Sequence, residues 1–276
     1  MTVYGVVLFA ALLHAAWNAI VKAGSDTLLT TILVAGFAAL LAGLALPFLE
    51  PPAEPSWPYI AASAILQIIY FWLLARNYQV ADLSRSYPLM RGCAPLIVAV
   101  VSVWWVGERL TATTWAGIAI ICAGILCMAG PGRAGRRGLG LALGNACIIA
   151  TYTLVDGVGA RLSGAPAAYT LWIFLLAGLA LAVWALARAP KRELLIRYTC
   201  RNWHLGLIGG CGTVVSYGLA LWAMTLAPVA VIAALRETSI LFATAISALI
   251  LKEKLTTARI VAAGVMALGA ATLRIP

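Results

Sequence analysis

The 276-residue sequence contains very little charge. Only 10% of its residues are Asp, Glu, Lys or Arg, and 63% are hydrophobic. Soluble domains contain about 25% charged and about 45–50% apolar residues, so a soluble fold of this length could not bury so much apolar surface. The composition excludes a soluble domain and predicts an all-α integral membrane protein surrounded by the lipid bilayer.

The sequence also lacks the residue groupings used in metal, redox and nucleotide chemistry. It has two histidines, His14 and His204, no HExxH motif, and no CxxC pair among its six cysteines. Scattered cysteines in apolar segments are typical of small buried hydrophobic residues. The glycines at Gly138, Gly140 and Gly144 follow no predicted strand, so they do not form a dinucleotide-binding loop. We predict no metal, no cofactor, no ATP drive and no enzymatic activity.

Positive charge outweighs negative charge, with 19 Lys and Arg against nine Asp and Glu. In a soluble protein this excess would suggest a nucleic-acid partner. Here the basic residues cluster in short segments such as 133–137 and 188–201, as in membrane proteins that fix their orientation and contact anionic headgroups. We predict no nucleic-acid partner, a multi-pass location in the cytoplasmic (inner) membrane, and both termini outside the cytoplasm.

Ten apolar segments approach the length of about 20 residues that a membrane-spanning helix needs. The first continues too far to be a cleaved signal peptide, so we predict an uncleaved span. The basic connection 188–201 is expected to form a helix at the membrane interface. The predicted spans are 3–22, 28–48, 58–78, 84–106, 112–130, 138–160, 166–187, 203–225, 228–250 and 256–274.

The ten predicted spans fall into two sets of five that repeat each other. Aligning Glu108 of the segment GERLT with Glu253 of the segment KEKLT places Arg91 on Arg236, seventeen residues upstream in both. The same comparison matches glycines in the last span of each set, Gly124 with Gly269, and glycines and aromatic residues in the first, Gly5 with Gly140 and Trp17 with Tyr152.

Five is an odd number of crossings, so the two sets must enter the bilayer in opposite directions. The sequence therefore predicts two inverted five-helix repeats, residues 1–134 and 135–276, that form one transport unit. Secondary transporters have this architecture, with the binding site near the midplane between the repeats.

The matched arginines are the leading candidates for a binding site. A charge inside a span costs about 2.5–3.5 kcal/mol on insertion scales and usually faces a cavity. The planar guanidinium groups of Arg91 and Arg236 suit a carboxylate, phosphate or phosphonate. The alternative is that each arginine is neutralised within the protein, Arg236 by Glu237 or Asp156.

Acidic residues inside the spans have two competing interpretations. Glu237 and Asp156 can bind a substrate amine or carry a coupling proton, or they can form structural salt bridges to the arginines. Glu108 and Glu253 lie at helix ends beside basic residues, where we favour a structural role at the interface.

Polar and aromatic residues complete the predicted cavity wall. His14 and Asn18 are one helical turn apart and share a face. The alternative for these two is hydrogen bonding between helices. We predict that Trp72, Tyr152 and Tyr217 belong to an aromatic lining, although most aromatic residues near span ends anchor the protein at the interface.

The segment HAAWNA at residues 14–19, together with the matched GERLT and KEKLT segments, resembles the drug/metabolite transporter superfamily, EamA type. The resemblance covers the whole chain and implies ten spans in two five-helix repeats. Members are similar to exporters of amino acids, nucleobases and drugs and to sugar-phosphate carriers. The family has no shared catalytic residues to transfer to this chain.

We therefore predict a secondary transporter that works by alternating access. It is expected to export a small anionic or zwitterionic solute, such as an amino acid or organic acid. Coupling to a proton or counter-solute and the oligomeric state stay open. The alternatives are an uptake carrier for an organophosphonate or phosphate ester, a lipid-handling membrane protein, and an intramembrane enzyme. Replacing Arg91 by alanine is expected to abolish transport and leave folding intact.

Overall fold

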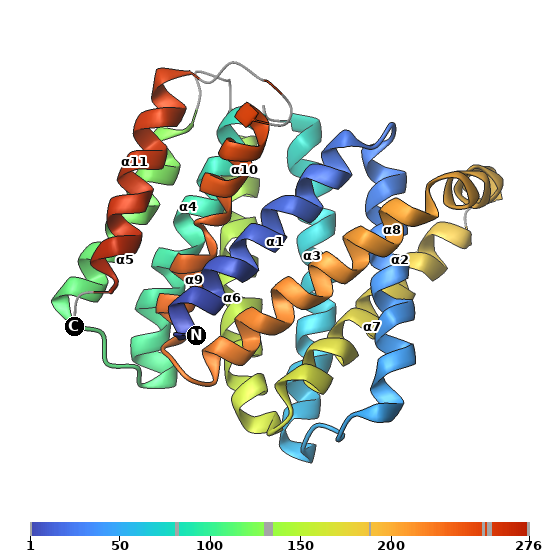
Figure 1. Ribbon diagram of the computed structural model, residues 1–276, viewed down its shortest axis with the longest axis horizontal. Helices are drawn as coiled ribbons and strands as arrows, with labels where there is room; N and C mark the ends of the chain where they lie inside the picture. The colour runs from blue at the N-terminus through green and yellow to red at the C-terminus, as the bar shows by residue number, and fades with distance from the viewer. Residues whose placement is uncertain are drawn as a thin grey trace.

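The structure, a computed structural model, describes residues 2–80, 83–129, 135–187, 189–249, 252 and 256–274. These residues form α-helices joined by short 3-10, π-helical and irregular segments, and they include no β-strand. The long helices lie side by side in one bundle (Figure 1). The all-helical fold predicted from composition is confirmed.

The helices follow one another with short connections. Their bounds are α1 (Val3–Ala23), α2 (Thr27–Ala45), α3 (Trp57–Val80), α4 (Leu83–Val101), α5 (Ala112–Cys127), α6 (Arg136–Ser163), α7 (Pro166–Leu186), α8 (Ala189–Met224), α9 (Val229–Arg236), α10 (Ser239–Leu249) and α11 (Thr257–Thr272). Two 3-10 turns, η1 (Leu46–Phe48) and η2 (Glu54–Ser56), join α2 to α3, and the π-helical η3 (Ser102–Val106) extends α4.

Eight helical segments of the described residues are long and apolar enough to cross a membrane. The two remaining predicted spans correspond to α5 and α11, which are apolar but have only 16 residues each. At about 1.5 Å per residue such a helix is shorter than the hydrocarbon core of about 30 Å. The predicted positions are therefore confirmed, whereas the count of ten spans is not.

The ninth predicted span, 228–250, is not one continuous helix. It breaks between α9 and α10 at Glu237 and Thr238. The backbone N–H groups of both residues donate to carbonyls three residues earlier, and the Thr238 hydroxyl donates to the Leu235 carbonyl at 2.6 Å. This tightening of the helix interrupts the regular ladder. The predicted span is present as the apolar segment Val229–Leu249, and the break within it lies beside Arg236.

The basic connection after α7 is helical, as the sequence predicted, and forms the first part of α8. The backbone leaves helical geometry at Asn202, where φ is −121° and ψ is 18°. The Asn202 side chain donates to the Tyr198 carbonyl, and the Tyr198 hydroxyl lies 2.7 Å from the hydroxyl of Thr30 on α2. In Figure 1 this first part turns away from the remainder of α8.

Equivalent helices of the two halves pack in equivalent ways. Helix α1 packs on α8 as α3 packs on α6, while α2 packs on α7 and α5 on α11. The matched glycines Gly124 and Gly269 both lie in the α5–α11 contact. A methyl group at Gly269 would come within 2.9 Å of the Gly117 carbonyl oxygen, and one at Gly124 within 3.1 Å of that of Ala262. The repeat in the sequence thus appears again as a repeat of helix contacts.

Both ends of the chain meet at one end of the bundle. The Tyr4 hydroxyl donates to the Leu273 carbonyl at 2.9 Å. At this end Arg161, in the last turn of α6, contacts Glu108 and Ala227, which lie in the connections before α5 and after α8. We call this the terminal end. The opposite end, where α6 and α8 begin with arginine-rich turns, is called the basic end.

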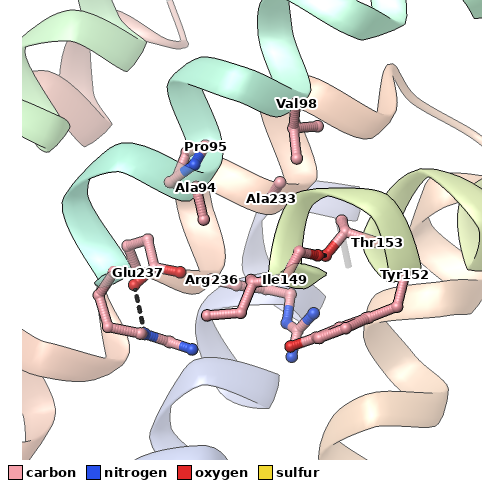
Figure 2. Close-up of a pocket in the computed structure, with 10 residues that line it drawn as sticks. Ala94, Pro95, Val98, Ile149, Tyr152, Thr153, Ala233, Arg236 and Glu237 are labelled. Carbon is pink, nitrogen blue, oxygen red and sulfur yellow. Dashed lines mark hydrogen bonds and ion pairs between the residues drawn. The ribbon is translucent and has the colours of Figure 1, made fainter. Parts of the chain in front are cut away.

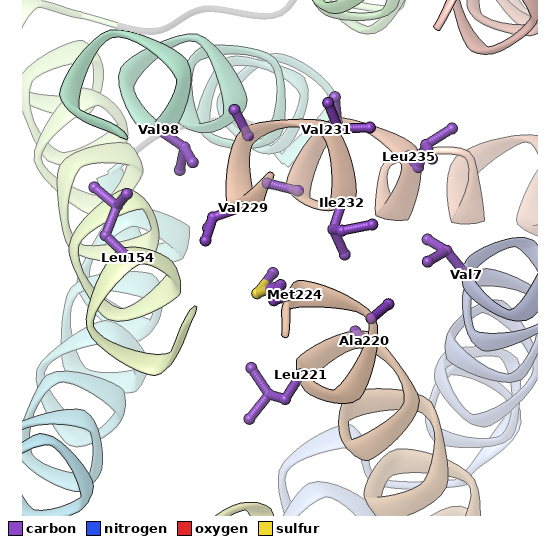
Figure 3. Close-up of a cluster of buried hydrophobic side chains, with 14 of the residues drawn as sticks. Val7, Val98, Leu154, Ala220, Leu221, Met224, Val229, Val231, Ile232 and Leu235 are labelled. Atoms are coloured by element: carbon purple, nitrogen blue, oxygen red, sulfur yellow. The ribbon is translucent and has the colours of Figure 1, made fainter. Parts of the chain in front are cut away.

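Apolar packing is densest toward the terminal end. Every residue of α9 from Val229 to Leu235 is buried, and Ile232 faces Met224 and Leu221 of α8 while Val98 of α4 lies nearby (Figure 3). In α10, on the basic side of the break, Ser239 is the only described residue that is fully buried. The two parts of the broken helix therefore have different surroundings.

Candidate functional site

Arg91 and Glu237 form an ion pair between the two halves of the chain. Arg91 comes from the middle of α4, and Glu237 from the break between α9 and α10. The Arg91 Nε atom lies 2.9 Å from the Glu237 Oε2 atom, and the side chains are 11% and 7% exposed. Figure 2 shows this contact as a dashed line. The contact is a close ion pair without the alignment of a good hydrogen bond. The prediction left open whether Glu237 neutralises Arg236; it pairs with Arg91 instead.

Arg236 has a different partner. Its guanidinium carbon lies 4.8 Å from the centroid of the Tyr217 ring, an arrangement that favours a cation on an aromatic face. No carboxylate of the described residues lies within ion-pair distance of Arg236. Adjacent residues in a helix point about 100° apart, which explains why Glu237 contacts Arg91 and not its neighbour.

Asp156 binds the hydroxyl group of Tyr217, the residue whose ring faces Arg236. Its carboxylate accepts hydrogen bonds from the Tyr217 hydroxyl at 2.5 Å and the Tyr169 hydroxyl at 3.1 Å, and the residue is completely buried. Gly159 makes room for Tyr169, because a methyl group there would lie 2.3 Å from that hydroxyl. Asp156 therefore forms hydrogen bonds with two tyrosines. The alternative prediction was a salt bridge to an arginine.

A small cavity lies between these groups. Its volume of about 20 Å³ is room for about one water molecule. Arg91 and Glu237 form one part of its wall and Arg236 another, and Tyr152 of α6 lies beside Arg236 in Figure 2. The other residues that line it are Ala94, Pro95, Val98, Ile149, Thr153 and Ala233.

The predicted residues of α1 lie close to this cavity but do not line it. His14 is within electrostatic reach of both Arg91 and Arg236. Its ring packs edge-on against Trp17, with 5.4 Å between ring centroids. The Asn18 side-chain amide donates to the His14 carbonyl of its own helix at 2.7 Å. The hydrogen bond that the structure gives Asn18 is thus local to α1.

Trp72 is not brought to this group. Its side chain is 56% exposed, and the Arg76 guanidinium carbon lies 5.2 Å from the centroid of its ring. Conversely, the Tyr169 hydroxyl donates a hydrogen bond to Asp156, although Tyr169 is not among the residues predicted for the site. Tyr169 follows Pro166 near a helix start, where an aromatic residue is usually an interface anchor, so the sequence contained no signal for its role.

Glu108 and Arg161 form a second polar cluster at the terminal end, which we call the terminal latch. Arg161 Nη2 donates to Glu108 Oε1 at 2.9 Å, and the backbone N–H of Val229, the first residue of α9, donates to the same oxygen at 2.6 Å. Arg161 also donates to the carbonyls of Met224 and Ala227 at 2.8 and 2.9 Å.

Glu108 is not a surface carboxylate, because its side chain is only 6% exposed, whereas the Arg161 side chain is 32% exposed. A carboxylate at a helix N-terminus is stabilised by the unpaired backbone N–H groups there. Glu108 comes from the first half and its partners from the second, so the latch ties the halves together. Glu253, its match in the repeat, lies outside the described residues.

No group of three or more His, Cys, Asp or Glu among the described residues is arranged to hold a metal ion. The site therefore consists of two arginines, two carboxylates and tyrosines. These groups can bind a charged solute through ion pairs and hydrogen bonds.

Comparison with protein families identifies the chain as a whole. A model of the EamA-like transporter family matches residues 1–130 and again residues 136–275. The chain belongs to the EamA-like transporter family. It is therefore a multi-pass membrane protein of a transporter family, built from two repeats, and the resemblance seen in the sequence is confirmed.

Comparison with solved structures supports the fold of this EamA-like chain. A crystal structure with 19% sequence identity covers 99% of this chain and 95% of its own, with a TM-score of 0.71. At that identity the likeness concerns the fold alone. No curated protein matches the chain.

Proposed function

We propose that this protein is a secondary transporter that moves a small anionic or zwitterionic solute across the cytoplasmic membrane by alternating access. The observation that carries the proposal is the environment of Arg236. This partly buried cation lines the cavity and lies on the face of Tyr217, and the described residues supply it with no ion pair. A charge within a membrane span that has no counter-ion is unfavourable, so an anionic group of the solute is the natural partner of Arg236.

Alternating access is supported by the relation between the halves. The first helix of each half packs on the third helix of the other half, as α1 does on α8 and α6 on α3. The helices that begin the halves, α1 and α6, run in opposite directions in Figure 1. Inverted repeats of five spans, 1–134 and 135–276, would produce both features. They would place Arg91 and Arg236 at similar depths on either side of the repeat axis.

Closure at one end is supported by the packing. The apolar residues of α9 and the terminal latch lie between the arginines and the terminal end. The cavity holds about one water molecule, so a solute can enter only when helices move apart. The break at Glu237 lets α10 move relative to α9, as interrupted helices do in other transporters.

We further propose export. The positive-charge bias favours a cytoplasmic position for the basic end, and α10 on that side of the break is incompletely covered by protein. A cytoplasmic solute would enter from the basic end and leave when the terminal end opens.

Transport by purified protein in proteoliposomes tests the proposal. Radiolabelled amino acids, organic acids and phosphonates would be screened for saturable flux at two pH values. Arg236→Ala should abolish flux of the accepted solute, because its anionic group loses its partner. Arg76→Ala is the matched control, since Arg76 lies outside the cavity on the exposed Trp72. Normal flux in Arg236→Ala would refute the site.

A further inference from the structure

The charges on the cavity wall are unequal in number. Two cations, Arg91 and Arg236, face one anion, Glu237. The second buried carboxylate, Asp156, forms no ion pair with either arginine. It accepts hydrogen bonds from the hydroxyls of Tyr217 and Tyr169 instead. Among the residues that the structure describes, the wall therefore offers one cation without an ion-pair partner, Arg236.

We infer that Glu237 is a specificity-determining residue that restricts the site to solutes with a single anionic group. This inference rests on the proposed binding of the solute at Arg236. Glu237 occupies Arg91, so a second anionic group on the solute finds no further unpaired cation among the described residues of the cavity wall. It would also lie close to the Glu237 carboxylate in a water-poor cavity, where like charges repel strongly. The favoured solutes are monocarboxylates and zwitterions with one carboxylate, and dicarboxylates are excluded.

Glu237 is held in place for this role by its position in the chain. Its backbone N–H donates to the Ala234 carbonyl, and its own carbonyl accepts from the backbone N–H of Ile240. The side chain is 7% exposed and close to Arg91 on one side. Both the backbone at the break and the ion pair therefore fix the carboxylate, which cannot turn away to admit a second anion without the α9–α10 break changing shape.

The backbone beside Arg91 is packed closely against a neighbouring helix. A methyl group at Gly92 would lie 2.9 Å from Leu126 of α5, so this glycine allows α4 to approach α5 closely. If Glu237 were neutral, Arg91 would become a second free cation on the same cavity wall. The site would then offer two arginines from the two halves, an arrangement suited to a solute with an anionic group at each end.

Binding by pairs of acids that differ by one carboxylate tests this inference. Purified protein would be titrated calorimetrically with propionate and succinate, and with alanine and aspartate. The unmodified protein should prefer the single-carboxylate member of each pair. Glu237→Gln keeps the shape and removes the charge, and it should shift each preference toward the dicarboxylate by about tenfold or more, which corresponds to about 1.4 kcal/mol. Glu193→Gln is the control, because it removes a carboxylate paired with Arg197 at an exposed site and should leave the preferences unchanged.

A second variant separates specificity from stability. Arg91→Gln with Glu237→Gln removes both partners, so no unpaired charge is left to disturb folding. It should retain the preference for a single carboxylate, since Arg236 is again the one cation without an ion-pair partner among the described residues of the cavity wall. Gain of dicarboxylate binding in this double variant would overturn the inference, as would equal binding of both pair members by the unmodified protein. Normal flux of the accepted solute in Arg236→Ala, by contrast, would refute the proposed site itself.

Discussion

Arg91 and Glu237 come from different halves of the chain, yet their side chains meet at 2.9 Å beside the only break in the ninth predicted span among the described residues. The contact links α4 to the α9–α10 segment. It leaves Arg236, the repeat partner of Arg91, without an ion pair in the described part of the chain. Equivalent positions in the two repeats thus have unlike electrostatic surroundings.

The ion pair predicts a stability loss that the sequence did not suggest. Arg91→Ala is expected to lower the free energy of unfolding by about 3–5 kcal/mol, because it leaves the buried Glu237 carboxylate unpaired. Arg91→Gln with Glu237→Gln should recover most of this loss. Thermal unfolding of the purified variants measures both effects. Equal stability of Arg91→Ala and the unmodified protein would contradict the pairing.

Two substitutions of Tyr217 separate its ring from its hydroxyl. Tyr217→Phe and Tyr217→Leu both lose the hydrogen bond to Asp156, but only Tyr217→Leu removes the aromatic face beneath Arg236. A cation–aromatic contact contributes about 0.5–2 kcal/mol. We therefore expect about a 2- to 30-fold difference in apparent affinity for the transported anion between the two variants. Transport assays over a range of solute concentrations would measure it, and identical affinities would show that the ring does not support Arg236.

The terminal latch predicts which end opens when it is broken. Glu108→Gln weakens the contacts to Arg161 and to the N-terminus of α9. Val98 is buried between the arginines and that end, so a cysteine at Val98 should react slowly with a membrane-impermeant maleimide added from the terminal side. On the Glu108→Gln background the rate should rise about tenfold, which corresponds to a shift of about 1.4 kcal/mol in opening.

Labelling of that cysteine is followed by peptide mass spectrometry, so the native cysteines can stay. Glu193→Gln provides the control, because it breaks an exposed ion pair far from the latch. An unchanged labelling rate in Glu108→Gln would show that the latch does not hold the terminal end shut.

Tyr169 packs closely on Gly159, so we expect a methyl group added at Gly159 to lower stability more than one added elsewhere in α6. Gly159→Ala would place the methyl 2.3 Å from the Tyr169 hydroxyl and displace it from Asp156. Such overpacking costs about 1–3 kcal/mol. Gly140→Ala in the same helix meets no atom within 4 Å and should be neutral or stabilising. Thermal unfolding compares the two, and equal melting temperatures would exclude a tightly packed Tyr169.

Much of the architecture could be predicted from patterns along the chain. Apolar length places the helices, and the repeat that matches Gly124 with Gly269 is seen again in the contact between α5 and α11. The sequence could not predict the break at Glu237. Local hydrogen bonds of Thr238 produce it, and no proline or glycine marks the position.

The candidate site was predicted less completely. Tyr152 lines the cavity and the Tyr217 ring lies against Arg236. Trp72, by contrast, lies on an exposed surface. All three are aromatic residues within apolar spans, so their sequence contexts look alike. Only the packing of neighbouring helices determines which side of a helix faces the cavity.

The sequence by itself determined that the chain is a membrane protein built from two repeats, with an arginine at the same place in each. Apolar composition and repeat spacing are properties of the chain alone, so they need no coordinates. Tertiary structure decided that Arg91 is paired with Glu237 and that Arg236 rests on Tyr217. An ion pair depends on which helix faces meet, and residues 146 positions apart in the sequence meet only after the two halves pack.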